Sequence, residues 1–327
     1  MSPAALSREH SADSHEPAVE LRQLDLFVDG RDALLVHAVV TSLLARDPAG
    51  SAVCLAILRR EHPGHPDLPT LTLLADRLRP SPPLPASHET VTAALEEINR
   101  TLVPATQRLF GSDAATFLQP LWRTLAAAAT GMTFDEGYPR AHASWLCQQF
   151  DDWATVRAAV EAEPDWARRP LLRYRRGLAL HFLGDHEAAI KQWLPLCWID
   201  PALFARYAPT LPNPTLREAW EAFERADPFG QSLDATHVAE WFPAWLLVRH
   251  RRLADLFEPV DVADAGTSAE AFRALLALVP LERQGLGTEV IAHRRTLQRL
   301  SPELFAYYME TLGGRRPSAP TRRPIAE

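Results

Sequence analysis

The 327-residue sequence lacks the features that mark several classes of protein. Its cysteines stand far apart at Cys54, Cys147 and Cys197, with no C-x-x-C pair, which argues against a disulfide framework and favours a reducing compartment. No apolar run reaches the roughly twenty residues of a membrane span. The N-terminus also has no basic start followed by an apolar stretch. We therefore expect a cytoplasmic protein without a membrane partner.

Motifs of familiar catalytic sites are missing as well. The chain has no G-x-S-x-G, H-E-x-x-H or G-x-x-x-x-G-K-[ST]. His62, His65 and Asp67 lie close together in sequence, but they supply too few ligands for zinc at a turn opened by prolines. We therefore expect no metal, no cofactor and no enzymatic activity. The alternative is an enzyme or small-ligand-binding helical protein whose site joins residues distant in the sequence.

The overall charge names no partner. The formal net charge is -7, which argues against coating of nucleic acid, so no direct nucleic-acid binding is expected. Hydrophobic residues make up 47% of the chain, enough for a substantial core.

Apolar residues recur at helical spacing almost everywhere, and alternating strand-like runs are almost absent. Prolines mark expected helix starts, because a polar cap followed by a first-turn proline is typical there. The pairs of this kind are Asp47-Pro48, Glu163-Pro164, Asp200-Pro201, Asn213-Pro214, Asp227-Pro228 and Ser301-Pro302. Further helical segments are expected at 88–130, 214–226, 234–258, 268–280 and 287–312.

One segment, "LLRYRRGLALHFLGDHEAAIKQWLPLCWIDP", resembles a tetratricopeptide repeat over residues 170–203. Gly177 and Ala189 fall at positions where the repeat needs small residues, and Trp193 would fill the gap against the neighbouring helix. Pro195 departs from the pattern and should kink the second helix, because it removes a helical hydrogen bond. Fainter resemblance extends over 31–66 and 139–203.

The resemblance implies an all-α fold, an irregular tetratricopeptide-like α-solenoid of helical hairpins. Its expected parts are a disordered leader at 1–18, a motif-bearing segment at 19–30, helical hairpins at 31–78, a proline-rich loop at 79–89, a helical-repeat domain at 90–312 and a disordered basic tail at 313–327. Such a protein is expected to be a scaffold that binds protein partners.

The motif-bearing segment contains Gln23, Leu24, Asp25, Leu26 and Phe27. This QLDLF peptide resembles the motif by which bacterial proteins dock in extended form on the DNA sliding clamp of replication. The resemblance places Leu26 and Phe27 in a deep apolar subsite of the clamp. Only "VDGR" separates the motif from a first helix expected near residue 31. The alternative is that these side chains cover the open end of the first helix pair.

A second candidate binding feature lies at 237–252. Trp241 and Trp245 are followed by Arg249 and Arg252, a combination that would suit a groove for a peptide or a nucleic acid strand. The alternative is a buried helix face with cations at the helix C-terminus, where they complement the helix dipole.

Overall fold

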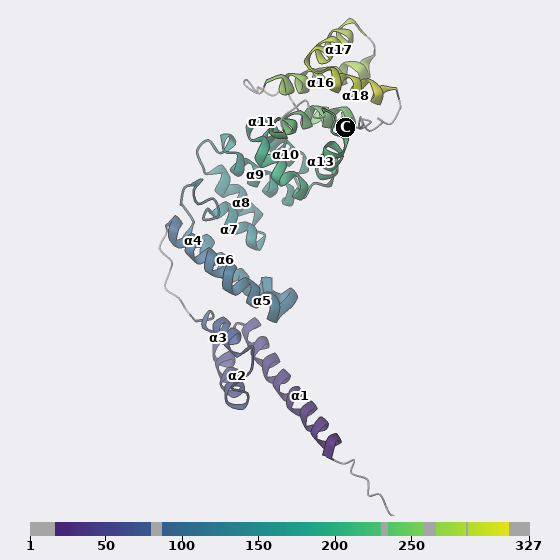
Figure 1. The fold of residues 1–327 in the computed structure, drawn as a ribbon. Helices are drawn as coiled ribbons and strands as arrows, with labels where there is room; N and C mark the ends of the chain where they lie inside the picture. Colours follow the sequence, from purple (N-terminus) through teal and green to yellow (C-terminus); the bar gives the residue numbers. More distant parts are fainter. Residues whose placement is uncertain (1–16, 80–86, 230–234, 258–265, 286, 314–327) are drawn as a thin grey trace, which may run out of the picture. The chain divides into compact units, whose positions relative to one another are not determined.

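The computed structural model describes residues 17–79, 87–229, 235–257, 266–285 and 287–313, without the side chains of 17–29, 235 and 236. Every regular element in these ranges is helical, so the all-α prediction is confirmed for them (Figure 1). None of the described helices has the length and apolar character needed to cross a membrane. Most of the expected tails and of the proline-rich loop lies outside the described residues, although residues 17 and 18 of the expected leader are helical.

The chain forms two compact units, residues 1–128 and 129–327. In the first, the helices are α1 (Pro17–Leu44), α2 (Pro48–Glu61), α3 (Leu68–Asp76), α4 (His88–Glu97), η1 (Ile98–Leu102), α5 (Val103–Phe110), η2 (Gly111–Asp113) and α6 (Ala114–Ala128). In the second, they are α7 (Ala143–Leu146), η3 (Cys147–Phe150), α8 (Trp153–Glu161), η4 (Trp166–Arg168), α9 (Pro170–Phe182), α10 (His186–Trp193), α11 (Leu196–Ile199), α12 (Pro201–Tyr207), η5 (Ala208–Thr210), α13 (Pro214–Ala226), α14 (Ala235–Val238), η7 (Ala239–Trp241), α15 (Phe242–Arg249), η8 (Arg251–Leu256), α16 (Gly266–Gln284), α17 (Thr288–Leu300) and α18 (Pro302–Leu312).

The division between the units falls after α6, and not at the proline-rich loop where the sequence placed it. Side chains join the two sides of that loop. Arg108 Nη2 lies 2.9 Å from Asp67 Oδ1, and Arg46 Nη1 donates to the Phe117 carbonyl at 3.2 Å. Residues 31–78 therefore belong with α4 to α6.

Four of the six predicted proline-marked helix starts are confirmed. Asp47, Asp200, Asn213 and Ser301 each accept a hydrogen bond from a first-turn backbone N–H of α2, α12, α13 and α18. The other two are wrong. Asp227 has a left-handed backbone (φ 40°) and closes α13, while Glu163 turns inward and accepts from Phe134 N at 2.9 Å.

Close packing of α9 on α10 depends on a small residue, Gly177, that lies against a large one, Trp193. A Cβ on Gly177 would collide with the indole of Trp193, which is fully buried and donates from Nε1 to the Tyr174 carbonyl at 3.2 Å. Ala189 is also fully buried. At Pro195 the helix does not only kink, as expected, but ends: α10 stops at Trp193, and α11 begins at Leu196.

The first helix begins at Pro17, well before the predicted start near residue 31. α1 and α2 are antiparallel neighbours, and the last residue of α2, Glu61, pairs with Arg31 (Nε to Oε2 2.8 Å). His65, just after α2, lies 3.3 Å from Asp32. Residues 17–30 therefore extend past the end of α2 (Figure 1).

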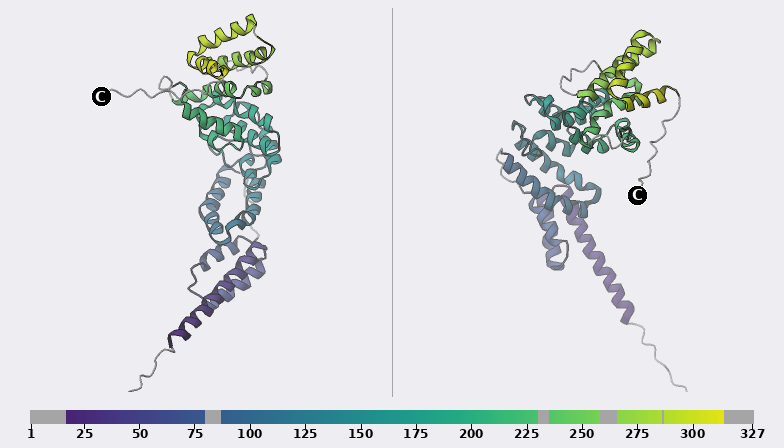
Figure 2. Two further views of the ribbon diagram at one scale, coloured as in Figure 1. Left: turned by 90° about the vertical axis from the view of Figure 1, so that its right-hand side faces the viewer. Right: turned by 45° about the horizontal axis from the view of Figure 1, so that its top comes forward.

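In the second unit, aromatic side chains fill the space between α12, α13 and α15. The cluster comprises Phe204, Trp220, Phe223, Phe242 and Trp245, which are all buried, with ring centroids of neighbouring pairs 5.2 to 6.4 Å apart. Both views in Figure 2 show α16 to α18 grouped at the C-terminal end of this unit. Packing of α15 against α13, α16 and α18 fixes the position of its C-terminal end.

Two glycine substitutions should have opposite effects on stability. Gly177→Ala should lower the free energy of unfolding by about 1 to 3 kcal/mol, because the added methyl overpacks against Trp193. Gly30→Ala should raise helix stability by roughly 0.5 to 1 kcal/mol, because a methyl there meets no atom within 4 Å. Chemical denaturation of both variants measures this. A stabilised Gly177→Ala protein would contradict the close packing of α9 on α10.

Candidate functional site

The structure separates the aromatic half of the 237–252 segment from its basic half. Trp245 is 0% exposed and Trp241 9% exposed, so neither indole presents a face on which a ligand could stack. Arg249 and Arg252 are exposed. The aromatic side chains thus form the buried face considered as the alternative, and α15 ends in its basic residue Arg249.

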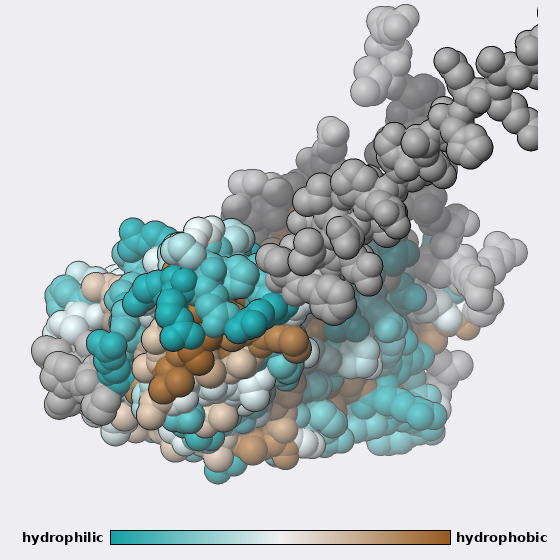
Figure 3. All heavy atoms as spheres, turned by 90° about the horizontal axis from the view of Figure 1, so that it is seen from below, coloured by the Kyte–Doolittle hydropathy of each residue, from teal (hydrophilic) through white to brown (hydrophobic). Residues whose placement is uncertain are grey.

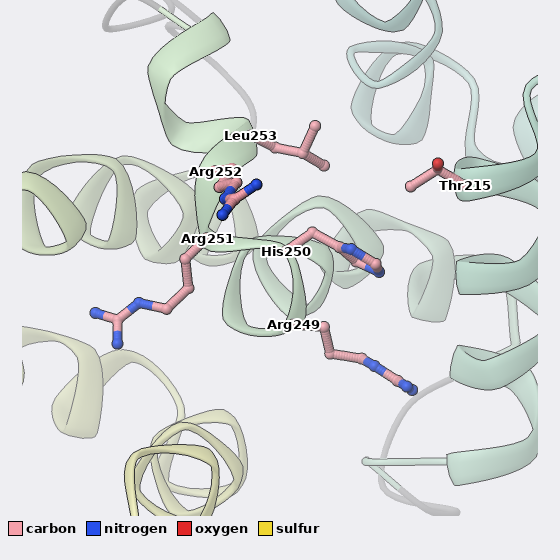
Figure 4. Close-up of a pocket in the computed structure, with 6 residues that line it drawn as sticks. All are labelled: Thr215, Arg249, His250, Arg251, Arg252 and Leu253. Atoms are coloured by element: carbon pink, nitrogen blue, oxygen red, sulfur yellow. The ribbon is translucent and has the colours of Figure 1, made fainter.

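The cations meet an open hollow of about 380 Å³ at this helix end. It is lined by Thr215, Arg249, His250, Arg251, Arg252 and Leu253. Figure 4 shows the side chains of Arg249 and His250 extending toward the side on which Thr215 lies, while Arg251 points the other way. The hollow therefore joins the end of α15 to the start of α13.

Local structure explains why these residues meet. α15 stops at His250, whose backbone leaves the helical region (φ -117°, ψ 64°), and η8 follows at once. Opposite them, α13 starts with Asn213 as its cap, whose Oδ1 accepts from Leu216 N at 3.0 Å. Pro214 has no N–H, and the Thr215 N–H belongs to the first turn, which has no intrahelical acceptor. Sequence analysis missed Thr215, although the Asn-Pro signal did mark its helix start.

The cations around the hollow differ in how their charge is balanced. Arg251 pairs with Glu282, and Arg283 holds both carboxylate oxygens of Asp255 at 2.6 and 2.8 Å. Within the ranges that the structure describes, no carboxylate oxygen lies within ion-pair distance (4.0 Å) of Arg249 or Arg252. Among the described residues, the positive charges of Arg249 and Arg252 are thus left without a carboxylate partner.

Arg249 and His250 are held in place by their surroundings. The Arg249 guanidinium lies 5.0 Å from the Trp245 ring centroid, and its side chain also hydrogen-bonds that of Tyr307, which stacks on the same indole. Burial, and then the charge of Arg249, lower the pKa of His250, so its imidazole is neutral at pH 7.

A second polar cluster lies inside the second unit, and sequence reasoning missed it. His142 Nδ1 lies 2.8 Å from Ser144 Oγ, and His142 Nε2 lies 3.3 Å from Glu163 Oε1. Arg175 donates to Ser144 Oγ at 2.9 Å and to the Pro139 carbonyl at 2.6 Å. Burial lowers the pKa of Arg175 to about 10, so it remains charged at neutral pH.

Ser144, His142 and Glu163 are arranged like the nucleophile, base and acid of a catalytic triad, but the residues around them indicate a structural role. Ser144 has no exposed surface, and Arg175 occupies a lone pair of its Oγ. Glu163 also accepts from Phe134 N. The cluster fastens the segment before α7 to α9, and no substrate can reach the serine.

The remaining sequence candidates have local roles. His65 contacts Asp32 and accepts from Asp67 N at 3.1 Å, and the described residues contain no group of three metal-binding side chains. Cys147 and Cys197 are buried, and burial raises the pKa of both, for Cys147 to about 11. Cys54 is only partly buried. The backbone of Gln23, Leu24, Asp25, Leu26 and Phe27 is helical within α1, and their side chains lie outside the described residues.

Exposed apolar side chains occur singly or in small groups. Leu34 and Val53 are exposed in the first unit, and Phe182 and Leu183 in the second. The face in Figure 3 likewise shows small apolar groups between polar residues. We therefore take the basic hollow as the candidate site. Comparisons with family models, curated proteins and solved structures found no match to this chain.

The Glu282 cluster beside the hollow predicts an acid-sensitive second unit. Burial raises the pKa of Glu282, but hydrogen bonds from Tyr308, Arg294 and Arg251 outweigh it, so the net pKa lies below the ordinary 4.5. The fold therefore favours the ionised carboxylate. Its stabilisation is present above the ordinary pKa and is lost as the pH falls through the lower, folded-state value.

We expect Glu282→Gln to flatten the decline in unfolding free energy below about pH 4.5, relative to the unchanged chain. Urea denaturation between pH 3 and pH 7 measures it. Glu221→Gln, an exposed carboxylate on α13, is the control and should keep the decline. Parallel pH profiles for all three proteins would contradict a role for the Glu282 cluster.

Proposed function

We propose that this protein is a non-enzymatic, cytoplasmic interaction scaffold of tetratricopeptide-like helical hairpins, tethered to the bacterial replication sliding clamp through Gln23–Phe27. The observation that carries the tether is the extension of α1 past the end of α2, where Arg31 pairs with Glu61. The QLDLF residues all lie in this extension. α2, the hairpin partner of α1, does not run alongside them.

Docking in extended form requires residues 23–27 to leave the helix, and the extension makes this inexpensive. Residues 17–30 are about four helical turns, a length at which an isolated helix is marginal in water. Gly30 stands at the junction with the paired part of α1 and lowers helix stability by roughly 0.8 to 1 kcal/mol relative to Ala. Unwinding can stop there without disturbing the Arg31–Glu61 pair.

Burial of the apolar residues of the motif supplies the free energy that offsets the cost of unwinding. Burying Leu24, Leu26 and Phe27 in an apolar cleft contributes about 1.5 to 3 kcal/mol each before ordering costs. This exceeds the cost of unwinding a marginal helix, and a weak to moderate affinity results. In the scaffold part, the α9–α10 hairpin with Gly177 against Trp193 supports the tetratricopeptide-like arrangement.

The tether is tested by replacing both Leu26 and Phe27 with Ala in the full chain. Binding to an immobilised bacterial sliding clamp should fall at least tenfold, because the deep apolar contacts are lost. The melting temperature should stay within about 2 °C, because the extension contributes little to the fold. Leu34→Ala, an exposed leucine further along α1, is the matched control and should bind normally. A protein that melts many degrees lower and never bound the clamp would show that the motif caps the first hairpin.

A second variant tests whether the helix must unwind. Gly30→Ala strengthens α1 without touching the motif, so it should weaken clamp binding several-fold while raising helicity. Surface plasmon resonance and circular dichroism on the same sample measure both quantities. Unchanged or tighter binding would mean that the motif docks as a helix.

The hollow favours a second candidate function, a small-ligand-binding helical protein. Its lining joins Thr215 to residues 249–253, which are distant in the sequence, as that alternative requires. The charges of Arg249 and Arg252, which no carboxylate in the described part of the chain neutralises, select for an anion.

A further inference from the structure

The hollow at the end of α15 has donors arranged on two sides. Arg249, His250 and Arg252 come from one continuous turn, and Thr215 comes from the start of α13. Figure 4 shows His250 and Arg249 directed toward the Thr215 side. A ligand between them would meet guanidinium, imidazole, hydroxyl and backbone N–H donors together.

We infer that this hollow is a binding site for a tetrahedral phosphoryl-type dianion, held by Arg249, Arg252, His250 and Thr215. This inference rests on the second candidate function and names its ligand. A single carboxylate is satisfied by one arginine, as Asp255 is by Nη1 of Arg283 in the same unit. Two arginines that pair with no described carboxylate, together with a hydroxyl and a helix-start N–H, suit an anion that offers more than two oxygen acceptors.

The other charged groups nearby are already committed. Arg251 lines the hollow but pairs with Glu282, which also holds Arg294 and Tyr308. Arg251 therefore fixes the turn, while Arg249 and Arg252 remain for the ligand. An exposed volume of about 380 Å³ leaves room for the group that carries the phosphoryl, so the site does not require free phosphate.

Binding should be coupled to protonation of His250. Of the side chains lining the hollow, His250 is the only one that titrates near neutral pH. Burial and the charge of Arg249 lower its pKa in the empty site. A bound dianion would raise the pKa of His250 and so favour its charged imidazolium form. Because the dianion binds the charged form more tightly, its affinity should increase as the pH falls.

The test is calorimetric titration of the full chain with sulfate and with inorganic phosphate at constant ionic strength, with acetate as the reference anion. Sulfate stays dianionic between pH 5.5 and pH 8, so its pH dependence reports the protein alone. We expect saturable sulfate and phosphate binding that acetate does not reproduce. Sulfate affinity should increase several-fold from pH 8 to pH 5.5 in the unchanged chain, and His250→Gln should remove this increase.

Variants locate the site. Arg252→Gln changes an exposed residue and should weaken sulfate binding about tenfold, and Arg249→Gln should do the same. The matched control is Arg225→Gln, an exposed arginine in the last turn of the same helix α13, about 15 Å along its axis from Thr215. Its affinity should stay within twofold of the unchanged chain.

Two results would overturn the inference. One is the absence of saturable binding beyond that of acetate, and the other is equal weakening by Arg225→Gln, which would indicate general charge attraction. A phosphoserine peptide that binds tighter than inorganic phosphate would identify a phosphorylated protein as the source of the group, and equal binding would identify a small phosphate compound. Clamp binding by Arg252→Gln, measured in parallel, should be normal, so failure of this site leaves the tether test independent.

Discussion

The geometry of the second unit's C-terminal half depends on one carboxylate, that of Glu282. It lies almost buried on α16 and receives donors from Arg251 of η8, Arg294 of α17 and Tyr308 of α18. A buried carboxylate is costly unless hydrogen-bond donors and opposite charges surround it, and here two arginines and a tyrosine hydroxyl from three elements do so. Because Arg251 is drawn toward Glu282, the turn after α15 takes one orientation, and Arg249 and His250 face the other way. The hollow stays open because Arg251, which follows His250 in the chain, pairs with Glu282 on the other side of the turn.

Much of the helical framework could be predicted from the sequence, because its signals are local. The range 214–226 was predicted with the bounds of α13, since an Asn-Pro cap and an amphipathic pattern lie within one short stretch. Glu163-Pro164 carries the same kind of signal and fails, because Glu163 instead satisfies Phe134 N and contacts His142, and both partners precede it by more than 20 residues. A cap prediction assumes that the polar residue serves its own helix. The assumption fails for Glu163, because its carboxylate bonds to a distant segment instead.

The candidate sites were predictable to a lesser degree, for the same reason. The basic run at 249–252 was visible, but which of its arginines pairs with a carboxylate depends on Glu282, which no spacing rule connects to the run. Trp241 and Trp245 looked suitable for stacking a ligand, but Trp245 is enclosed by the aromatic cluster between α12, α13 and α15, and Trp241 packs on Phe229. Thr215 enters the hollow only through the tertiary fold. Residue types at a site are readable in sequence, whereas their availability is decided by packing.

The two proposed binding features make opposite demands on the fold. Arg249 acts through position, so it is held against Trp245 and Tyr307, and His250 is fixed where α15 ends. Rigid donors lose little conformational entropy when an anion binds. Gln23–Phe27 must instead change conformation to dock, so it benefits from lying beyond the Arg31–Glu61 pair, after which α1 is supported by α2. Weak packing against the rest of the fold is a disadvantage for a catalytic or anion-binding group. It is an advantage for a tethering peptide, because the free energy needed to unwind the peptide is subtracted directly from the free energy gained by docking.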